Sequence, residues 1–172
     1  PYNDDFGDEL YMIEEHAGEK HGDKASFGYS DELIRTKDML QDIRSDEDII
    51  IDEAAYIRAR LFDMVIGDWD RHEDQWRWAK FKIDDKTVYK PFPRDRDQAF
   101  SRMTDGFLLG LASKLIPASK PLRSYDASIS NLKALNMVPY SLDMALINEA
   151  DKKVWNTQVE YISSHLTDEV IE

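Results

Sequence analysis

The 172-residue chain contains no cysteine, only seven glycines and six prolines, and no long apolar run. The absence of cysteine excludes disulfide scaffolds, cysteine zinc sites, iron–sulfur clusters and thiol catalysis. No run approaches the roughly 18 apolar residues that a membrane-spanning helix requires. We therefore expect no direct membrane insertion by this segment.

Positive charge is also scarce, because 22 Lys and Arg residues stand against 35 Asp and Glu residues, which gives a net charge of −13. This balance excludes a nucleic-acid partner and docking on anionic lipid, since both need clustered basic residues. The chain is 42% hydrophobic and 33% charged, which is typical of a folded domain. A chain of this length buries roughly 70% of its unfolded surface, so we expect a single domain over residues 1–172.

Hydrophobic periodicity predicts an α+β fold that is mostly helical. We expect a short strand at 9–15, a loop at 16–30, a helix from a Ser30 cap to Ile43, and a helix from an Asp52 cap to Gly67. Next comes a β-hairpin with strands at 76–82 and 88–92, whose second strand ends at a sheet edge because of Pro91 and Pro93. Further helices are predicted at 107–116, 129–135 and 141–166. The last of these is capped at Ser141, after Pro139, and is broken near 148–151. Its buried side chains are expected to be Met144, Leu146, Val154, Val159 and Ile162.

Two clusters of charged residues flank the predicted hairpin, at 67–76 and at 93–100. The first holds four carboxylates, a histidine, an arginine and an amide between Gly67 and Trp76. Because the hairpin turns the chain back, both clusters can lie at the same end of it. Oxygen ligands of this kind suit Mg²⁺ or Mn²⁺ better than Zn²⁺. The alternative is a solvated acidic loop, which the preceding apolar helix and the two tryptophans in the cluster argue against.

The order of these motifs resembles that of a known group of enzymes. An apolar helix, the loop Asp70-Arg-x-x-x-Gln75-Trp76, a hairpin and then Asp95-x-x-x-Ala-Phe100 looks like the catalytic C-lobe of the atypical kinases. This group includes the HipA-like kinases, the type II phosphatidylinositol 4-kinases, the secretory-pathway casein kinases and the spore-coat kinases. The resemblance covers about residues 9–116, with specific motifs only in the two charged clusters.

The resemblance implies a role for individual residues. Asp70 matches the catalytic aspartate that orients the attacking hydroxyl, and Gln75 matches the metal-binding asparagine. Asp95 matches the metal-binding aspartate after the hairpin, with Asp97 as the alternative ligand because Asp95-Arg-Asp97 replaces the usual Asp-x-Gly turn. Residues Met12, Ile13 and Glu14 lie in the strand that resembles a kinase hinge, where backbone groups would meet the adenine of ATP.

Part of a kinase is missing from the sequence. No glycine-rich phosphate loop precedes the match, and no strand carries a lysine with a partner glutamate on a helix. The resemblance therefore implies a kinase-like C-lobe whose N-lobe lies upstream in a longer parent protein. Within the C-lobe, the hinge-like strand is 9–15, the site-bearing core is 30–116, and the C-terminal helices are 117–172. We expect little or no turnover from the isolated chain. Residues 59–78 and 93–100 also resemble segments of large bacterial envelope proteins, which favours the cell envelope or periplasm, with the cytoplasm as the alternative.

The function implied by the resemblance is a phosphotransferase that uses Mg²⁺ or Mn²⁺ and ATP and acts on a hydroxyl group of a protein, lipid or small molecule. Two alternatives stay open, namely a non-catalytic pseudokinase-type assembly module and a cation-binding accessory domain of a phosphohydrolase. Within the first cluster, Arg71 is expected to pair with a neighbouring carboxylate and fix the loop. His72 is interpreted as structural, and Asp68 and Asp74 as capping or solvated groups. Arg94 and Arg96 are alternatively ion-pair partners that neutralise Asp95 and Asp97.

Overall fold

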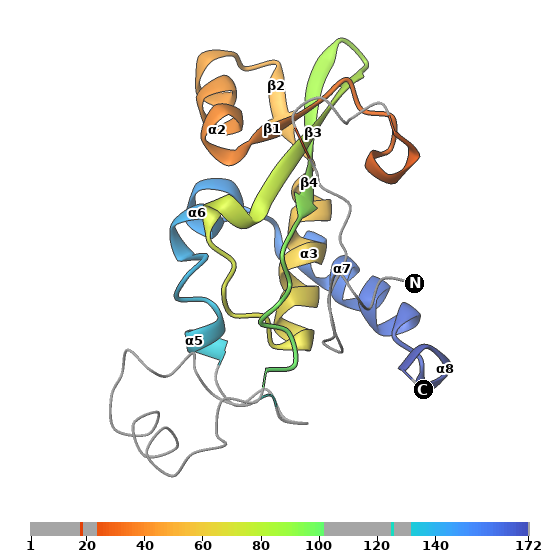
Figure 1. Cartoon of the computed structure of the whole chain (residues 1–172). Coiled ribbons are helices and arrows are strands. Elements are labelled where there is room, and N and C mark those ends of the chain that lie inside the picture. The colour runs from red at the N-terminus through yellow and green to blue at the C-terminus, as the bar shows by residue number, and fades with distance from the viewer. Residues whose placement is uncertain (1–17, 19–23, 102–124, 126–131, 172) are drawn as a thin grey trace, which may run out of the picture.

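The computed structural model describes residues 18, 24–101, 125 and 132–171. The predicted strand at 9–15 and the predicted helix at 107–116 lie outside these residues. The described residues form an α+β fold with one four-stranded mixed sheet and six α-helices, as expected from the hydrophobic pattern (Figure 1). None of the helices in this part of the chain is both long and apolar enough to cross a membrane.

The sheet consists of β1 (Glu32–Arg35), β2 (Ile49–Ile51), β3 (Trp76–Ile83) and β4 (Lys86–Pro93), in the order β1-β3-β4-β2. The predicted hairpin is confirmed as the antiparallel pair β3–β4, while β1 runs antiparallel to β3 and β2 runs parallel to β4. Asp84 and Asp85 form its two-residue turn, both with positive φ, the geometry that matches the twist of a hairpin. Because β2 pairs with β4 only as far as Tyr89, the two prolines lie on an unpaired edge, as predicted.

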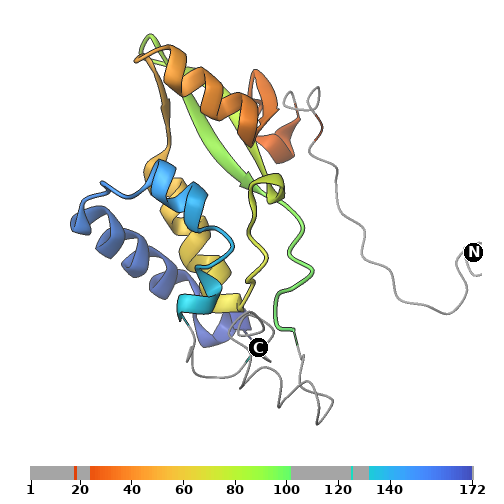
Figure 2. The same cartoon turned by 90° about the vertical axis from the view of Figure 1, so that its left-hand side faces the viewer.

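The helices are α2 (Thr36–Ser45), α3 (Glu53–Ile66), α5 (Leu132–Leu135), α6 (Tyr140–Leu146), α7 (Lys152–His165) and α8 (Asp168–Ile171), with single 3₁₀ turns η1 (Ala25–Phe27) and η2 (Glu73–Gln75). The predicted boundaries of α3 are confirmed, since the Asp52 side chain accepts a hydrogen bond from the Ala55 amide and Gly67 ends the helix at φ 72°. The predicted break near 148–151 separates α6 from α7. Figure 2 shows α3 running away from the sheet with α7 alongside it.

The prediction of one helix from Ser30 to Ile43 is wrong, because the structure places β1 before α2. In β1, Leu33 pairs with Ala79 and Ile34 with Trp78, and both apolar side chains are buried on the sheet. Pairing with a distant strand thus outweighs the local helical spacing. The short β2 was not predicted at all, and α6 has Pro139 rather than Ser141 at its N-cap.

The main core lies between one face of the sheet and α2, α3, α6 and α7. At its centre Tyr56, Trp76 and Trp78 pack together, with ring centroids 4.9 to 6.2 Å apart. Leu146, Val154 and Ile162 contribute to the interior as predicted, whereas Met144 and Val159 are 45% and 47% exposed, contrary to prediction. A smaller cluster on the other face of the sheet consists of Phe27, Leu33 and Ala79, with Phe81 and Phe92 against it. The rigid core therefore holds the hairpin and α3 in a fixed relation.

Two glycines with left-handed φ provide a matched test of the turn after α3. A Cβ at Gly67 would lie 2.7 Å from Cδ2 of Tyr125, whereas a Cβ at Gly28 would lie 3.4 Å from Cζ of Phe81. We expect Gly28→Ala to lower the free energy of unfolding by about 1 kcal/mol through backbone strain alone. Gly67→Ala should cost about 2–3 kcal/mol, because it adds a steric clash to the same strain.

Urea denaturation of both variants measures the difference. Adding Tyr125→Ala should remove the extra cost of Gly67→Ala and leave a loss similar to that of Gly28→Ala. Equal losses for the two single variants would contradict the predicted contact between Tyr125 and Gly67.

Candidate functional site

The two charged clusters leave the open end of the hairpin, where Trp76 pairs with Pro93. The Arg94 amide donates to the Gln75 carbonyl at 2.8 Å, and the Phe100 amide donates to the Ile66 carbonyl at 2.9 Å. Figure 2 shows the two segments descending side by side from the hairpin toward the end of α3. The prediction that both clusters lie at one end of the hairpin is confirmed. We call residues 67–75 the first loop and residues 94–101 the second loop.

The buried guanidinium of Arg71 joins the two loops. Its Nη1 donates to the carbonyl oxygens of Arg94 at 2.6 Å and Asp95 at 3.1 Å, and its Nη2 donates to the Gln75 carbonyl at 3.2 Å. Nη1 also lies 3.1 Å from Oδ2 of Asp68. The expectation that Arg71 pairs with a neighbouring carboxylate and fixes the loop is therefore confirmed, and its contacts extend to the second loop as well.

Asp63, on α3, is a second buried carboxylate in contact with Arg71, and the sequence analysis missed it. Its Oδ2 lies 3.3 Å from Nε of Arg71, and its Oδ1 accepts a hydrogen bond from Nε of Arg96 at 3.0 Å. Burial raises the pKa of Asp63, against the opposing effects of Arg71, Arg96 and Arg60. The sequence feature that could have identified Asp63 as buried is its place as an acidic residue within the otherwise apolar segment Leu61–Val65.

Asp68 is not the capping or solvated group that we expected, since it is only 1% exposed. Its side chain pairs with Arg71 and accepts a hydrogen bond of 3.4 Å from the Asp70 amide. Burial raises the pKa of the Asp68 carboxyl, although the Arg71 guanidinium lowers it. Asp68 therefore belongs to the interior support of the loop, while Asp74 is exposed as expected.

The structure brings together two of the predicted metal ligands. Nε2 of Gln75 lies 3.4 Å from Oδ2 of Asp95, with the Gln75 side chain nearly buried and Asp95 exposed at a left-handed φ of 48°. Asp97 is exposed and has no hydrogen bond or ion pair to the other described residues. Met12, Ile13 and Glu14 lie outside the described residues, so the geometry of the hinge-like strand is not described.

Asp70 has a carboxylate that no described side chain engages. Its amide donates to Asp68, but its side chain has no hydrogen bond or ion pair within the described residues. Asp70 is partly exposed, whereas its neighbour Asp68 is buried and paired. Of these two carboxylates in the first loop, Asp70 is thus the one that can accept a proton from an external group.

A divalent cation fits the donor set of Gln75 and Asp95. Turning the terminal amide of Gln75 exchanges Nε2 for Oε1, so the pair can offer two oxygen ligands. Mg²⁺ is commonly bound by one or two protein ligands together with water and phosphate oxygens. No group of three or more acidic or histidine side chains among the described residues forms a complete cation site. The pair can therefore supply two protein oxygens, and any further ligands of a cation would have to come from outside the described residues.

Two other charged residues of the loops, His72 and Arg96, are engaged within the protein. Nδ1 of His72 accepts a hydrogen bond from the Asp74 amide at 3.3 Å and so caps η2, in agreement with a structural role. Arg96 pairs with Asp63 rather than with Asp95 or Asp97, so it does not neutralise the two candidate ligands as the alternative reading required.

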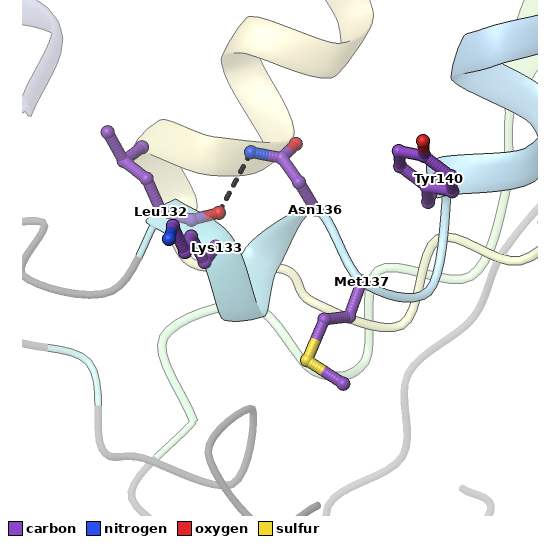
Figure 3. A pocket seen from close by; sticks show the side chains of 5 residues that line it. All are labelled: Leu132, Lys133, Asn136, Met137 and Tyr140. Carbon is purple, nitrogen blue, oxygen red and sulfur yellow. Dashed lines mark hydrogen bonds between the residues drawn. The ribbon is translucent and has the colours of Figure 1, made fainter. Parts of the chain in front are cut away.

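An open pocket of about 490 Å³ lies along α5 and the start of α6. Its lining is mainly apolar and consists of Leu132, Lys133, Asn136, Met137 and Tyr140 (Figure 3). None of the predicted site residues lines it. Asn136 connects it to the interior, because Oδ1 of Asn136 accepts a hydrogen bond from the buried Arg60 at 3.0 Å.

The loops at one end of the hairpin thus carry Asp70, whose carboxylate no described side chain engages, and a carboxylate–amide pair, Asp95 and Gln75. No family model matches the chain, and comparisons with curated proteins and with solved structures give no match. The geometry of the two loops and the motifs that they contain are therefore the basis for assigning a function.

The buried carboxyl of Asp68 makes stability depend on pH in a defined direction. Because its pKa is raised in the folded protein, its contribution to stability is complete below the unfolded pKa of about 4 and is lost as the pH rises through the folded pKa. Asp68→Asn removes this titration. We expect the free energy of unfolding of the wild type, minus that of Asp68→Asn, to fall between pH 4 and pH 7.

Urea denaturation at several pH values tests this dependence. Asp97→Asn is the control for the loss of one charge, because Asp97 is exposed and lacks an ion-pair partner among the described residues. A difference that rises with pH would mean that pairing with Arg71 outweighs burial and lowers the pKa of Asp68.

Proposed function

We propose that this chain is the catalytic C-lobe of a metal- and ATP-dependent phosphotransferase. The observation that carries the proposal is the contact of 3.4 Å between Gln75 and Asp95, made by loops that Arg71 holds together. The first loop also holds Asp70, whose carboxylate has no partner among the described residues. These are the residues that the kinase-like motif assigns to metal binding and catalysis. The contact between two of them, Gln75 and Asp95, at one end of the hairpin supports that assignment.

Each residue has a role that its surroundings allow. Asp70 would orient the attacking hydroxyl group and accept its proton, since no described residue occupies its carboxylate. Asp95 and Gln75 would hold Mg²⁺ or Mn²⁺, which neutralises charge on the phosphates of ATP. Asp95 rather than Asp97 is favoured as the ligand because Gln75 contacts Asp95.

The proposal assigns nucleotide clamping to an N-lobe upstream in a longer parent protein. Met12, Ile13 and Glu14 would contact adenine through backbone groups, as the resemblance to a hinge strand implies. Phosphoryl transfer depends mainly on positioning and charge neutralisation, so a C-lobe without the phosphate clamp should transfer phosphate slowly. The substrate class proposed is a hydroxyl group on a protein, lipid or small molecule.

Binding of Mg·ATP by the full-length protein tests the metal site. We expect Asp95→Ala to weaken binding at least about 10-fold in calorimetry, because it removes the charged ligand of the cation. Asp97→Ala is the matched control, two residues away on the same loop and exposed, and should change the affinity less than about 2-fold.

The outcomes separate the competing functions. Absence of Mg·ATP binding by the wild type, or binding that Asp95→Ala leaves unchanged, contradicts the proposed kinase site. Loss of binding in Asp97→Ala instead assigns the cation to Asp97. Binding of Mg²⁺ without ATP favours the cation-binding accessory domain.

Replacing Asp70 distinguishes a catalyst from a pseudokinase. Asp70→Asn keeps the size of the side chain but removes the proton acceptor, so we expect Mg·ATP affinity within about 3-fold of the wild type and phosphoryl transfer at least about 100-fold slower. Glu73→Gln, an exposed carboxylate on the same loop, is the control and should retain transfer. Transfer of phosphate from radiolabelled ATP to an acceptor measures the rate. Tight Mg·ATP binding without phosphoryl transfer by the wild type would contradict a catalytic role and favour the pseudokinase-type assembly module.

A further inference from the structure

The carboxylate of Asp63 contacts arginines that belong to both loops of the site. Arg71 from the first loop lies 3.3 Å from Oδ2, and Arg96 from the second loop lies 3.0 Å from Oδ1. A third arginine, Arg60 on α3 itself, lies 3.6 Å from Oδ2. Asp63, Arg60 and Arg71 are completely buried, whereas the Arg96 side chain is 32% exposed.

The basic and acidic groups around Asp63 are equal in number, and all but Arg96 and Asp143 are completely buried. The three arginines Arg60, Arg71 and Arg96 are matched by the three aspartates Asp63, Asp68 and Asp143. Loss of one charge from such a set leaves a buried cation without its partner, which the structure can relieve only by moving the cation. Two of the three arginines, Arg71 and Arg96, belong to the loops that form the site.

These contacts hold Asp95 from both sides. Arg71, paired with Asp63, binds the carbonyl of Arg94 and that of Asp95, and Arg96, the next residue, is itself paired with Asp63. The backbone of Asp95 is left-handed at φ 48°, a conformation that aspartate adopts more readily than most residues, and these contacts on both sides stabilise it. The direction of the Asp95 carboxylate toward Gln75 is thereby set by a residue that is itself buried in α3.

We infer that Asp63 is a positioning residue for the cation ligands Gln75 and Asp95. Asp63 acts through Arg71 and Arg96 and touches neither the cation nor the substrate. This inference rests on the proposed function. Asp63 is therefore needed for metal affinity as well as for folding.

Binding of Mn²⁺ to the full-length protein, followed by electron paramagnetic resonance in the presence of ATP, separates positioning from stability. At a temperature where circular dichroism shows every variant to be folded, Asp63→Asn should raise the Kd of Mn²⁺ about 10- to 100-fold, as is typical when a group that orients metal ligands is removed. Arg96→Gln removes only one of the contacts and leaves Asp63 in place. Arg96→Gln should raise the Kd of Mn²⁺ less than Asp63→Asn does, and it is the variant to compare with the wild type if Asp63→Asn does not fold.

The matched control is Arg58→Gln, also on α3. Arg58 donates to Gln158 at 2.8 Å and stacks on Tyr161 at 4.0 Å, so it stabilises the contact with α7. None of its contacts with the described residues reaches the two loops. We expect this variant to lower the melting temperature without changing the Kd of Mn²⁺.

Two results would overturn the inference alone, with the wild type still binding Mn²⁺. One is an unchanged Kd in both Asp63→Asn and Arg96→Gln, and the other is an equal rise in Arg58→Gln. Failure of the wild type to bind Mn²⁺ with ATP would instead overturn the proposed function, and the inference with it.

Discussion

The arrangement of the two loops depends on a single buried guanidinium, that of Arg71. It satisfies three backbone carbonyls, two from the second loop and one from the end of the first, while pairing with carboxylates on either side. Only arginine has enough donors in a fixed planar arrangement to make these bonds at once. The guanidinium also lies 4.9 Å from the centre of the Trp76 ring, which ties the loops to the main core.

The interior around Arg71 is ionic rather than apolar, and this has a physical consequence. Replacing such groups by hydrophobic ones can leave a fold equally stable, so a buried ionic network is not by itself a source of high stability, whereas removing one partner is costly. The network continues to α6, where Asp143 accepts hydrogen bonds from Arg60 at 3.0 Å and from the Tyr56 hydroxyl at 2.9 Å. Burial and the neighbouring Asp143 raise the pKa of Tyr56 well above its usual range, so this hydroxyl remains a donor. The loops, α3 and α6 are therefore held as one unit.

Local signals in the sequence predicted the parts of the fold that depend on neighbouring residues. The cap at Asp52, the end of α3 at Gly67 and the hairpin are all encoded within a few residues, and all three are confirmed. The strand β1 was missed because its apolar pair Leu33 and Ile34 is buried by a partner more than forty residues away. Periodicity alone cannot report such pairing.

The same limit applies to the site. The motif located Asp70, Gln75 and Asp95, and the structure brings the last two into contact. Asp63 and Asp68 were not recognised as buried, because burial of a charged residue depends on which arginines the fold brings to it. Conversely, Val159 fits a helical apolar stripe yet faces solvent, since the described part of the fold sets nothing against that side of α7.

The register of the hairpin fixes the distance between the two loops. Gln75 and Arg94 flank the pair Trp76 and Pro93, so a slip of two residues between the strands would carry Asp95 about 7 Å away from Gln75. The turn at Asp84 and Asp85 lies at the other end of strands eight residues long, roughly 25 Å away. Sequence and length can therefore vary at the tip of the hairpin during evolution without moving the site, while a single insertion within either strand would misalign it.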